Sequence, residues 1–301
     1  MSEDVLNKLF STFKVSAEVF HNGQYCGNWS IDTSGASYLS FHVVTHGRCY
    51  LMVEGVKSEI IELNQGDLVL FPHDAKHCIS NEPNFTSEVN SSKSNNYEDG
   101  LVENATGLVC GYFVHQHPLI KQLTAYLPPS IIINNNCDES GNLSTLVKLL
   151  IEESLNPNRG STFILEKLSE CVLASLFREF LSLEKGLFAA LANERLNPSI
   201  AAIIKQPENK WTLAVLAELS HMSRSSYSEL FKKVVGLPVM EYVTQWRVSV
   251  AYRLLQDHSE TTLSVALQVG YENESSFSKA FKRVLGLNPG EVRAKPKTTH
   301  P

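Results

Sequence analysis

The sequence lacks the features that would anchor the chain in a membrane or stabilise it by disulfide bonds. Its six cysteines stand singly, with no Cys-x-x-Cys pair, so we expect reduced thiols. No apolar run approaches the ~20 residues of a membrane-spanning helix. The first residues, Met-Ser-Glu-Asp, lack the basic and apolar order of a signal peptide. These absences predict a cytoplasmic protein with no membrane partner.

The chain also has no net positive charge to offer a nucleic acid, because its formal charge is −6. The charges are unevenly distributed, however. Residues 209–301 carry 12 Lys and Arg against 8 Asp and Glu, whereas residues 1–208 carry 14 against 24. Since basic surfaces attract phosphates, any contact with nucleic acid is expected in the last third of the chain.

Hydrophobic periodicity changes twice along the 301 residues. A short helix is predicted at 3–13. The next hundred residues contain short β-rich runs, typical of an antiparallel sandwich or barrel, at 38–45, 49–53, 67–71 and 106–114. A polar loop is expected at 81–104. Helical periodicity follows at 118–127, 142–155 and 161–183.

The longest of these helices carries an apolar stripe at Leu165, Leu168, Val172, Leu176 and Phe180. We expect the stripe to pack within its own domain, with an exposed dimer seam as the alternative. The predicted fold class is α+β. A β-barrel or sandwich at 1–130 is followed by a helical linker at 131–196, a possible dimerisation region, and by an all-α domain at 197–301.

The last third repeats itself at an ungapped offset of 50 residues. Three segments of the first copy match the second: Thr212–Val215 with Thr262–Val265, Ser225–Ser228 with Ser275–Ser278, and Phe231–Leu237 with Phe281–Leu287. Such a match indicates one supersecondary unit that occurs twice. Each copy is predicted to be a helix, a tight turn and a second helix, capped by Ser223 or Asn273 and ended by Gly236 or Gly286.

A second helix that is small and polar at its start and basic towards its end suits the major groove of DNA. The alternative is a helical bundle with a basic solvated face. The residues predicted to contact DNA in the first copy are Ser223, Arg224, Ser225, Ser226, Ser228, Glu229, Lys232 and Lys233. Those of the second copy are Asn273, Glu274, Ser275, Ser276, Ser278, Lys279, Lys282 and Arg283.

One amphipathic helix is predicted between the copies, at Val239–Gln256. Eighteen residues span about 27 Å at ~1.5 Å per residue. Because one turn of DNA is ~34 Å, this spacer suits two helices that read successive major grooves. For Trp246 the expected role is core packing, and for Arg247 a salt bridge or a phosphate contact.

These residues resemble the AraC/XylS family of bacterial transcription regulators over about 197–293. The first motif matches at Trp211-Thr-Leu, Leu216-Ala217, Met222–Ser225 and Gly236; the spacer at Trp246-Arg247; and the second motif at Gly270–Ser278, Gly286 and Pro289. The resemblance implies binding to double-stranded promoter DNA, with contact to RNA polymerase possible. Glu274, near Glu272, departs from a surface made for phosphate and suggests weak or cytosine-directed contact by the second helix.

The β-rich region resembles the cupin-type effector domain of many such regulators. Gly66–Pro72, His77 and Asn81 follow the second cupin motif, with Asp74 where that motif has Gly. The His-x-His pair of the first motif is replaced by His42 and His46. The resemblance implies a small effector in the barrel interior, which would alter dimer geometry or free the DNA-binding domain.

A metal-dependent cupin enzyme with a helical appendage is the alternative function. Imidazole suits iron, manganese or zinc, and the candidate ligands are His42, His73, His77 and His115. Cys78, beside His77, leaves thiol or zinc sensing open. The main prediction is a regulator without cofactor, metal or catalytic residues.

Overall fold

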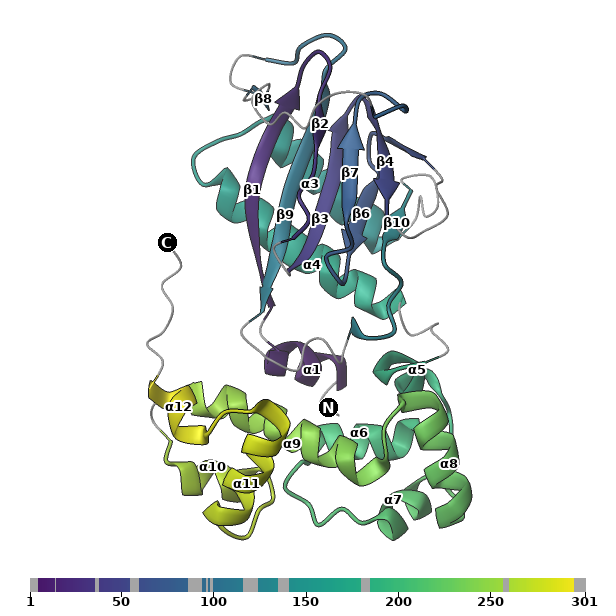
Figure 1. The fold of residues 1–301 in the computed structure, drawn as a ribbon, viewed down its shortest axis with the longest axis vertical. Helices are drawn as coiled ribbons and strands as arrows, with labels where there is room; N and C mark the ends of the chain where they lie inside the picture. Colours follow the sequence, from purple (N-terminus) through teal and green to yellow (C-terminus); the bar gives the residue numbers. More distant parts are fainter. Residues whose placement is uncertain are drawn as a thin grey trace. The chain divides into compact units, whose positions relative to one another are not determined.

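The computed structural model describes residues 5–13, 15–35, 38–54, 60–85, 94–95, 97, 100–115, 124–134, 141–179, 185–256 and 260–294. Contacts divide the chain into two compact units (Figure 1). We name Met1–Lys14, His115–Tyr126 and Glu179–Pro301 the helical unit, and Val15–Val114 with Leu127–Arg178 the sheet unit. The domain boundaries predicted at residues 130 and 196 differ from the boundaries of these two units. They remain a prediction of where separately folding domains begin and end. None of the described helices is both long and apolar enough to cross a membrane.

The sheet unit contains two sheets packed face to face (Figure 1). The six-stranded sheet has the order β10-β6-β3-β9-β1-β8: Ile131–Ile133, Leu68–Phe71, Leu39–His46, Thr106–His115, Val15–Tyr25 and Ser94–Asn95. The four-stranded sheet has the order β2-β7-β4-β5: Ser30–Ile31, His77–Ser80, Arg48–Val53 and Ile61–Asn64. Strand β3 pairs antiparallel with β6 and β9, strand β4 with β5 and β7, and the pairs β1–β8, β2–β7 and β6–β10 are antiparallel as well. The sandwich prediction is confirmed, and no closed barrel is formed by the strands that the structure describes.

The two sheets enclose one hydrophobic core. Large fully buried side chains from both sheets fill it, among them Trp29, Leu51, Phe71 and Ile79. Alternation along the strands explains this, because every second side chain of β3 and β9 points between the sheets. The other face of the six-stranded sheet is covered by helix α3, Asn142–Leu155, and helix α4, Ser161–Glu179.

The predicted stripe of α4 packs within the sheet unit. Leu165, Val172 and Leu176 are buried and Leu168 is half-buried, while the side chain of Phe180 lies outside the described residues. The interpretation of this stripe as an exposed dimer seam is therefore wrong. Most of the predicted helix at 118–127, and part of the loop at 81–104, also lie outside the described residues.

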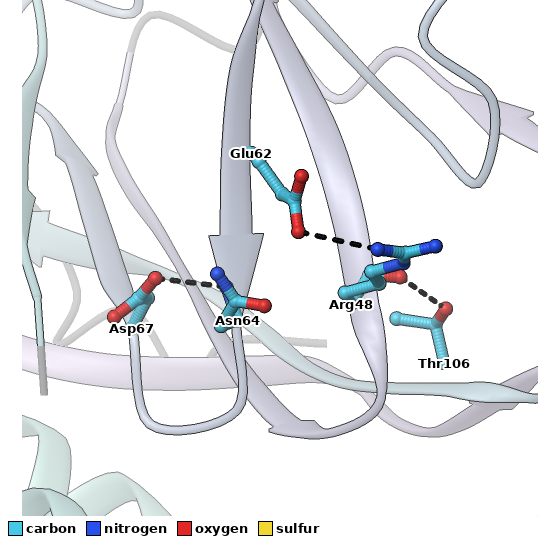
Figure 2. A network of polar contacts seen from close by, with 5 residues as sticks. All are labelled: Arg48, Glu62, Asn64, Asp67 and Thr106. Carbon is cyan, nitrogen blue, oxygen red and sulfur yellow. Dashed lines mark hydrogen bonds and ion pairs between the residues drawn. The ribbon is translucent and has the colours of Figure 1, made fainter.

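Gly66 and Asp67 of the cupin-like motif shape the turn between β5 and β6. Gly66 has φ +94°, which glycine adopts without strain. The side chain of Asp67 accepts a hydrogen bond from the backbone N–H of Asn64 at 2.8 Å. Figure 2 shows this turn beside Arg48, which pairs with Glu62 at 3.5 Å. The role of Gly66 and Asp67 is therefore structural, since they shape the turn between β5 and β6.

The helical unit contains α1, Val5–Phe13, and eight described helices from the second half of the chain. These are α5 Leu187–Ala192, α6 Asn197–Lys205, α7 Leu213–Leu219, α8 Arg224–Val235, α9 Val239–Gln256, α10 Thr262–Gln268, α11 Glu274–Leu285 and α12 Pro289–Ala294. Helix α1 packs on α6 and α9 through Leu9 and Phe13, which are 1% and 6% exposed. The ring of Phe13 lies 6.3 Å from that of Trp246. Trp246 is 3% exposed, which confirms its predicted place in the core.

The repeat forms two helix-turn-helix motifs, α7–α8 and α10–α11. Ser223 and Asn273 cap the second helices and Gly236 and Gly286 end them in the left-handed conformation, as predicted. The ungapped alignment is wrong for the first helices, because Thr212 and Thr261, 49 residues apart, are their caps. Three residues separate α7 from Ser223, whereas four separate α10 from Asn273. The turn of the second motif is one residue longer.

The two terminal glycines provide a matched test of local strain. A Cβ on Gly236 would collide with the hydroxyl of Tyr126 and lie 3.0 Å from its Cζ, whereas a Cβ on Gly286 would meet nothing within 4 Å. We expect Gly286→Ala to lower the free energy of unfolding by about 1–2 kcal/mol, the strain of the left-handed conformation. Gly236→Ala should cost more, since Tyr126 must also move. Urea unfolding measures both, and equal losses would contradict a role for Tyr126.

Candidate nucleic-acid interface

Helices α8 and α11 bury one side and expose the other in the same way. Tyr227 and Phe231 in α8, like Phe277 and Phe281 in α11, are fully buried. Of the sixteen predicted DNA-contacting residues, Ser228 and Ser278 are half-buried and the other fourteen are exposed. The structure therefore places each predicted set on the solvent side of one helix, as a reading helix requires.

The first turns of α8 and α11 are ordered by their caps. The Ser223 hydroxyl accepts from the backbone N–H of Ser226 at 3.3 Å and lies 3.1 Å from the Ser225 hydroxyl. In α11 the Asn273 side chain accepts from the N–H of Ser276 at 2.9 Å. The remaining N–H groups of a helix N-terminus attract anions, so these turns present a favourable end to a phosphate.

Positive charge gathers at the opposite ends of the helices. Lys232 and Lys233 lie in the last turn of α8, and Lys282 and Arg283 in the last turn of α11. Their position suits both the helix dipole and contact with phosphates. Glu274 lies in the first turn of α11, where a carboxylate stabilises the helix by the same dipole. This stabilisation of α11 explains why an acidic residue occurs on its otherwise polar and basic side.

A buried polar network behind α8 has no signal in the sequence. The hydroxyl of Ser199 in α6 accepts from Tyr227 at 2.9 Å and from Ser220 at 3.0 Å. Ser220, which ends α7, is 5% exposed, while the neighbouring Leu219 is 39% exposed. Three hydroxyls thus join α6, α7 and α8, and they fix the position of α8 within the helical unit.

Arg247 differs from its predicted salt-bridge or phosphate role. Its Nε donates to the carbonyl of Pro207 at 2.8 Å, and its Nη2 donates to that of Asn209 at 2.7 Å. Its guanidinium lies over the ring of Tyr271, 5.7 Å from the centroid. The reason for the difference is geometric, since two backbone carbonyls of the segment before α7 face the planar fork of this side chain.

The sheet unit brings only two of the four candidate metal ligands together. Nε2 of His42 and Nε2 of His77 lie 3.1 Å apart, and the Thr33 hydroxyl lies 3.0 and 2.9 Å from them. His73 instead lies 3.1 Å from the carbonyl of Leu127, and the side chain of His115 is outside the described residues. Burial lowers the pKa of both His42 and His77, so both are neutral near pH 7.

This donor set fits a metal poorly. Among the described residues, no group of three or more His, Cys, Asp or Glu side chains is arranged to hold a metal ion. The two Nε2 atoms are already within hydrogen-bond distance of each other, and the Thr33 hydroxyl lies within hydrogen-bond distance of both. Cys78 lies outside this cluster, with its sulfur 2.9 Å from the Ser30 hydroxyl. The His42–Thr33–His77 group is thus a hydrogen-bonded link between β3 and β7.

Comparison with known families covers most of the chain. A family model described as Cupin matches residues 4–182, more than half of the sequence, and one described as Helix-turn-helix domain matches residues 216–295. The first match spans the sheet unit, and the second begins within α7 and continues through the second motif.

Relatives that match over more than four fifths of the chain are transcription regulators as well. An AraC-like transcription regulator of Streptomyces lividans is 30% identical over 263 residues, 84% of each chain. An HTH-type transcriptional regulator of Haemophilus influenzae is 29% identical over 262 residues, 84% of this chain and 85% of the other. The RCS-specific transcriptional activator RclR of Escherichia coli K12 is 28% identical over 259 residues, 83% of each.

Proposed function

Since this chain belongs to the AraC-like family of transcription regulators and carries a cupin domain, we propose that α8 and α11 read successive major grooves on one side of promoter DNA. The observation that supports this most is their equivalence. Both helices have a side-chain cap, two buried aromatic residues at equivalent positions, and exposed serines and last-turn cations at equivalent positions. A shared structural role alone would not require these exposed residues to match.

The residues divide into two groups by their place on the reading helices. Arg224, Ser225 and Ser228, near the start of α8, contact base edges, where Arg pairs with guanine and Ser with several bases. The equivalent positions of α11 are Glu274, Ser275 and Ser278, with Glu274 directed at cytosine. The cations of the last turns contact phosphates and position the protein without reading sequence.

Two alanine substitutions separate these roles. The DNA is an operator selected from random duplexes with the full chain. Arg224→Ala should lose about 1–3 kcal/mol of discrimination at one base pair of the first half-site. Lys282→Ala should weaken all sequences equally and lower the slope of log K against log salt by about 1. Competition binding at several salt concentrations measures both. Parental behaviour of both variants would contradict the placement of the reading sides.

We further infer that the sheet unit responds to a small effector. The space between its sheets is filled by packed side chains, and the cavity between the six-stranded sheet and helices α3 and α4 has room for about one water molecule. An effector that enters either place has to change the packing, which couples binding to a change of conformation. Melting of the full chain with candidate metabolites, followed by operator binding, tests this inference.

The remaining partners are a second copy of the chain and RNA polymerase. Phe163 and Ile164 on α4 are 63% and 41% exposed, which supports a homodimer through this helix, and sedimentation at several concentrations tests it. The regulatory role places the protein in the cytoplasm with its promoter, and it needs no catalysis. The two-imidazole cluster of the sheet unit favours this assignment over a metal-dependent enzyme.

A further inference from the structure

The turn of the second motif meets the segment that precedes the first motif. The turn of the second motif is one residue longer than that of the first, and we take Glu272, directly before the cap Asn273, as the additional residue. Its carboxylate pairs with the Lys210 ammonium at 3.1 Å. Gly270 has φ +85°, and a Cβ there would lie 2.7 Å from both the Glu208 carbonyl and Nη2 of Arg247. Because the first motif closes without the additional residue, the longer turn serves the contact between motifs rather than the turn itself.

Arg247 lies at the centre of this contact. It is on the spacer helix α9, and its two hydrogen bonds to Pro207 and Asn209 hold the segment before α7. The same guanidinium packs on Tyr271, whose ring lies edge-on to Phe277 at 5.5 Å in the core of the second motif. One side chain therefore touches the first motif's lead-in segment, the spacer and the second motif's turn. We name this group the Arg247 junction.

The bonds of Arg247 matter more than the nearby ion pair. The side chains of Lys210 and Glu272 are 89% and 80% exposed, and exposed pairs contribute little. Arg247 is half-buried and makes two hydrogen bonds with one planar group. A lysine at this position would keep the charge but lose the fork and the flat surface for Tyr271.

From this geometry we propose that Arg247 is a positioning residue that fixes the angle between α8 and α11, and thereby the half-site spacing that the protein accepts. The proposal rests on the proposed reading of DNA by both helices. Moving one half-site by one base pair turns it by ~35° and shifts it by ~3.4 Å. A rigid junction cannot follow this movement, whereas a loosened one can.

The test uses the full chain and two kinds of duplex. Duplexes of the first kind carry both half-sites, at the selected spacing or with one base pair added or removed between them. Duplexes of the second kind carry a single half-site. The parent should bind the selected spacing about tenfold more tightly than its neighbours, the equivalent of one lost base contact. Arg247→Ala and Arg247→Lys should reduce this preference to about twofold or less, while binding to single half-sites stays near parental.

Arg195→Ala is the matched control, because Arg195 is exposed in the same unit and carries the same charge. It should keep the spacing preference. An unchanged spacing preference in both Arg247 variants would overturn the proposal. An equal loss of affinity for duplexes with one and with two half-sites would also overturn it, because such a loss indicates an effect on folding or on charge. A parent without spacing preference would overturn it too, leaving the proposed function intact. A parent that binds no selected duplex would refute the proposed function itself.

Discussion

Replacement of Lys232, Lys233, Lys282 and Arg283 by alanine together is expected to weaken operator binding about a thousandfold at ~0.15 M salt. Each cation that neutralises one phosphate contributes about 0.9 to the slope of log K against log salt. Four such contacts therefore lower the slope by about 3.6, and near 1 M salt the variant and the parent should bind almost equally. Titrations of the same duplex over a salt series measure the slope directly.

The control removes four positive charges from the sheet unit: Lys76, Lys148, Arg159 and Lys167, all exposed. Its net charge equals that of the first variant, so any general repulsion between protein and DNA is the same in both. The salt slope of this control should stay parental. Equal slopes for the two variants would show that binding follows net charge and would contradict the assignment of the last turns of α8 and α11 to phosphates.

Phe281→Ala is expected to destabilise the helical unit by about 3–5 kcal/mol, the range for truncating a buried phenylalanine. Its side chain is fully buried and its ring lies 5.4 Å from that of Phe277. Phe231→Ala should have an equal effect on the first motif, where the ring lies 5.6 Å from that of Tyr242. Such a loss is a large part of the stability of a domain and should abolish operator binding near 37 °C.

Urea unfolding followed by tryptophan fluorescence measures this loss, because Trp211 and Trp246 lie in the helical unit. Phe281→Leu keeps most of the volume and should cost less than about 1.5 kcal/mol. Leu267→Ala is the surface control, since Leu267 is 53% exposed and its truncation should stay within about 0.5 kcal/mol. A loss below 1 kcal/mol for Phe281→Ala would contradict a tightly packed second motif.

The sequence predicts best where the signal is local. The residue types of Ser223, Gly236, Asn273 and Gly286 predict helix ends, and the structure has each in that role. The offset of the first helices is not fixed by residue type, because Thr261 and Thr262 are both suitable caps. Packing makes the choice, since Leu216 and Ala217 must correspond to the buried Val265 and Ala266.

Contacts with backbone atoms or between distant strands had no sequence signal. The partners of Arg247 are two carbonyls about 40 residues away, and any residue type supplies a carbonyl. In the sheet unit, alternation predicted strands but not their order, so that a barrel and a sandwich remained equivalent. The closeness of His42 and His77 depends on how the two sheets face each other, and nothing in the sequence around Thr33 indicates that its hydroxyl meets both of them.

Helix α1 gives the chain an unusual path. The sheet unit begins at Val15, directly after this helix, and the chain returns to the helical unit at His115–Tyr126 and again from Glu179 onward. The sheet unit therefore consists of two segments inserted into the sequence of the helical unit. A fragment cut near residue 197 therefore discards Leu9 and Phe13 and uncovers an apolar part of α6 and α9. Failure of such a fragment to bind DNA would therefore reflect a missing structural piece as readily as a missing regulatory one. A shortened chain keeps the helical unit only if it retains His115–Tyr126 together with residues 1–14 and 179–301, because Tyr126 lies against Gly186 and Gly236.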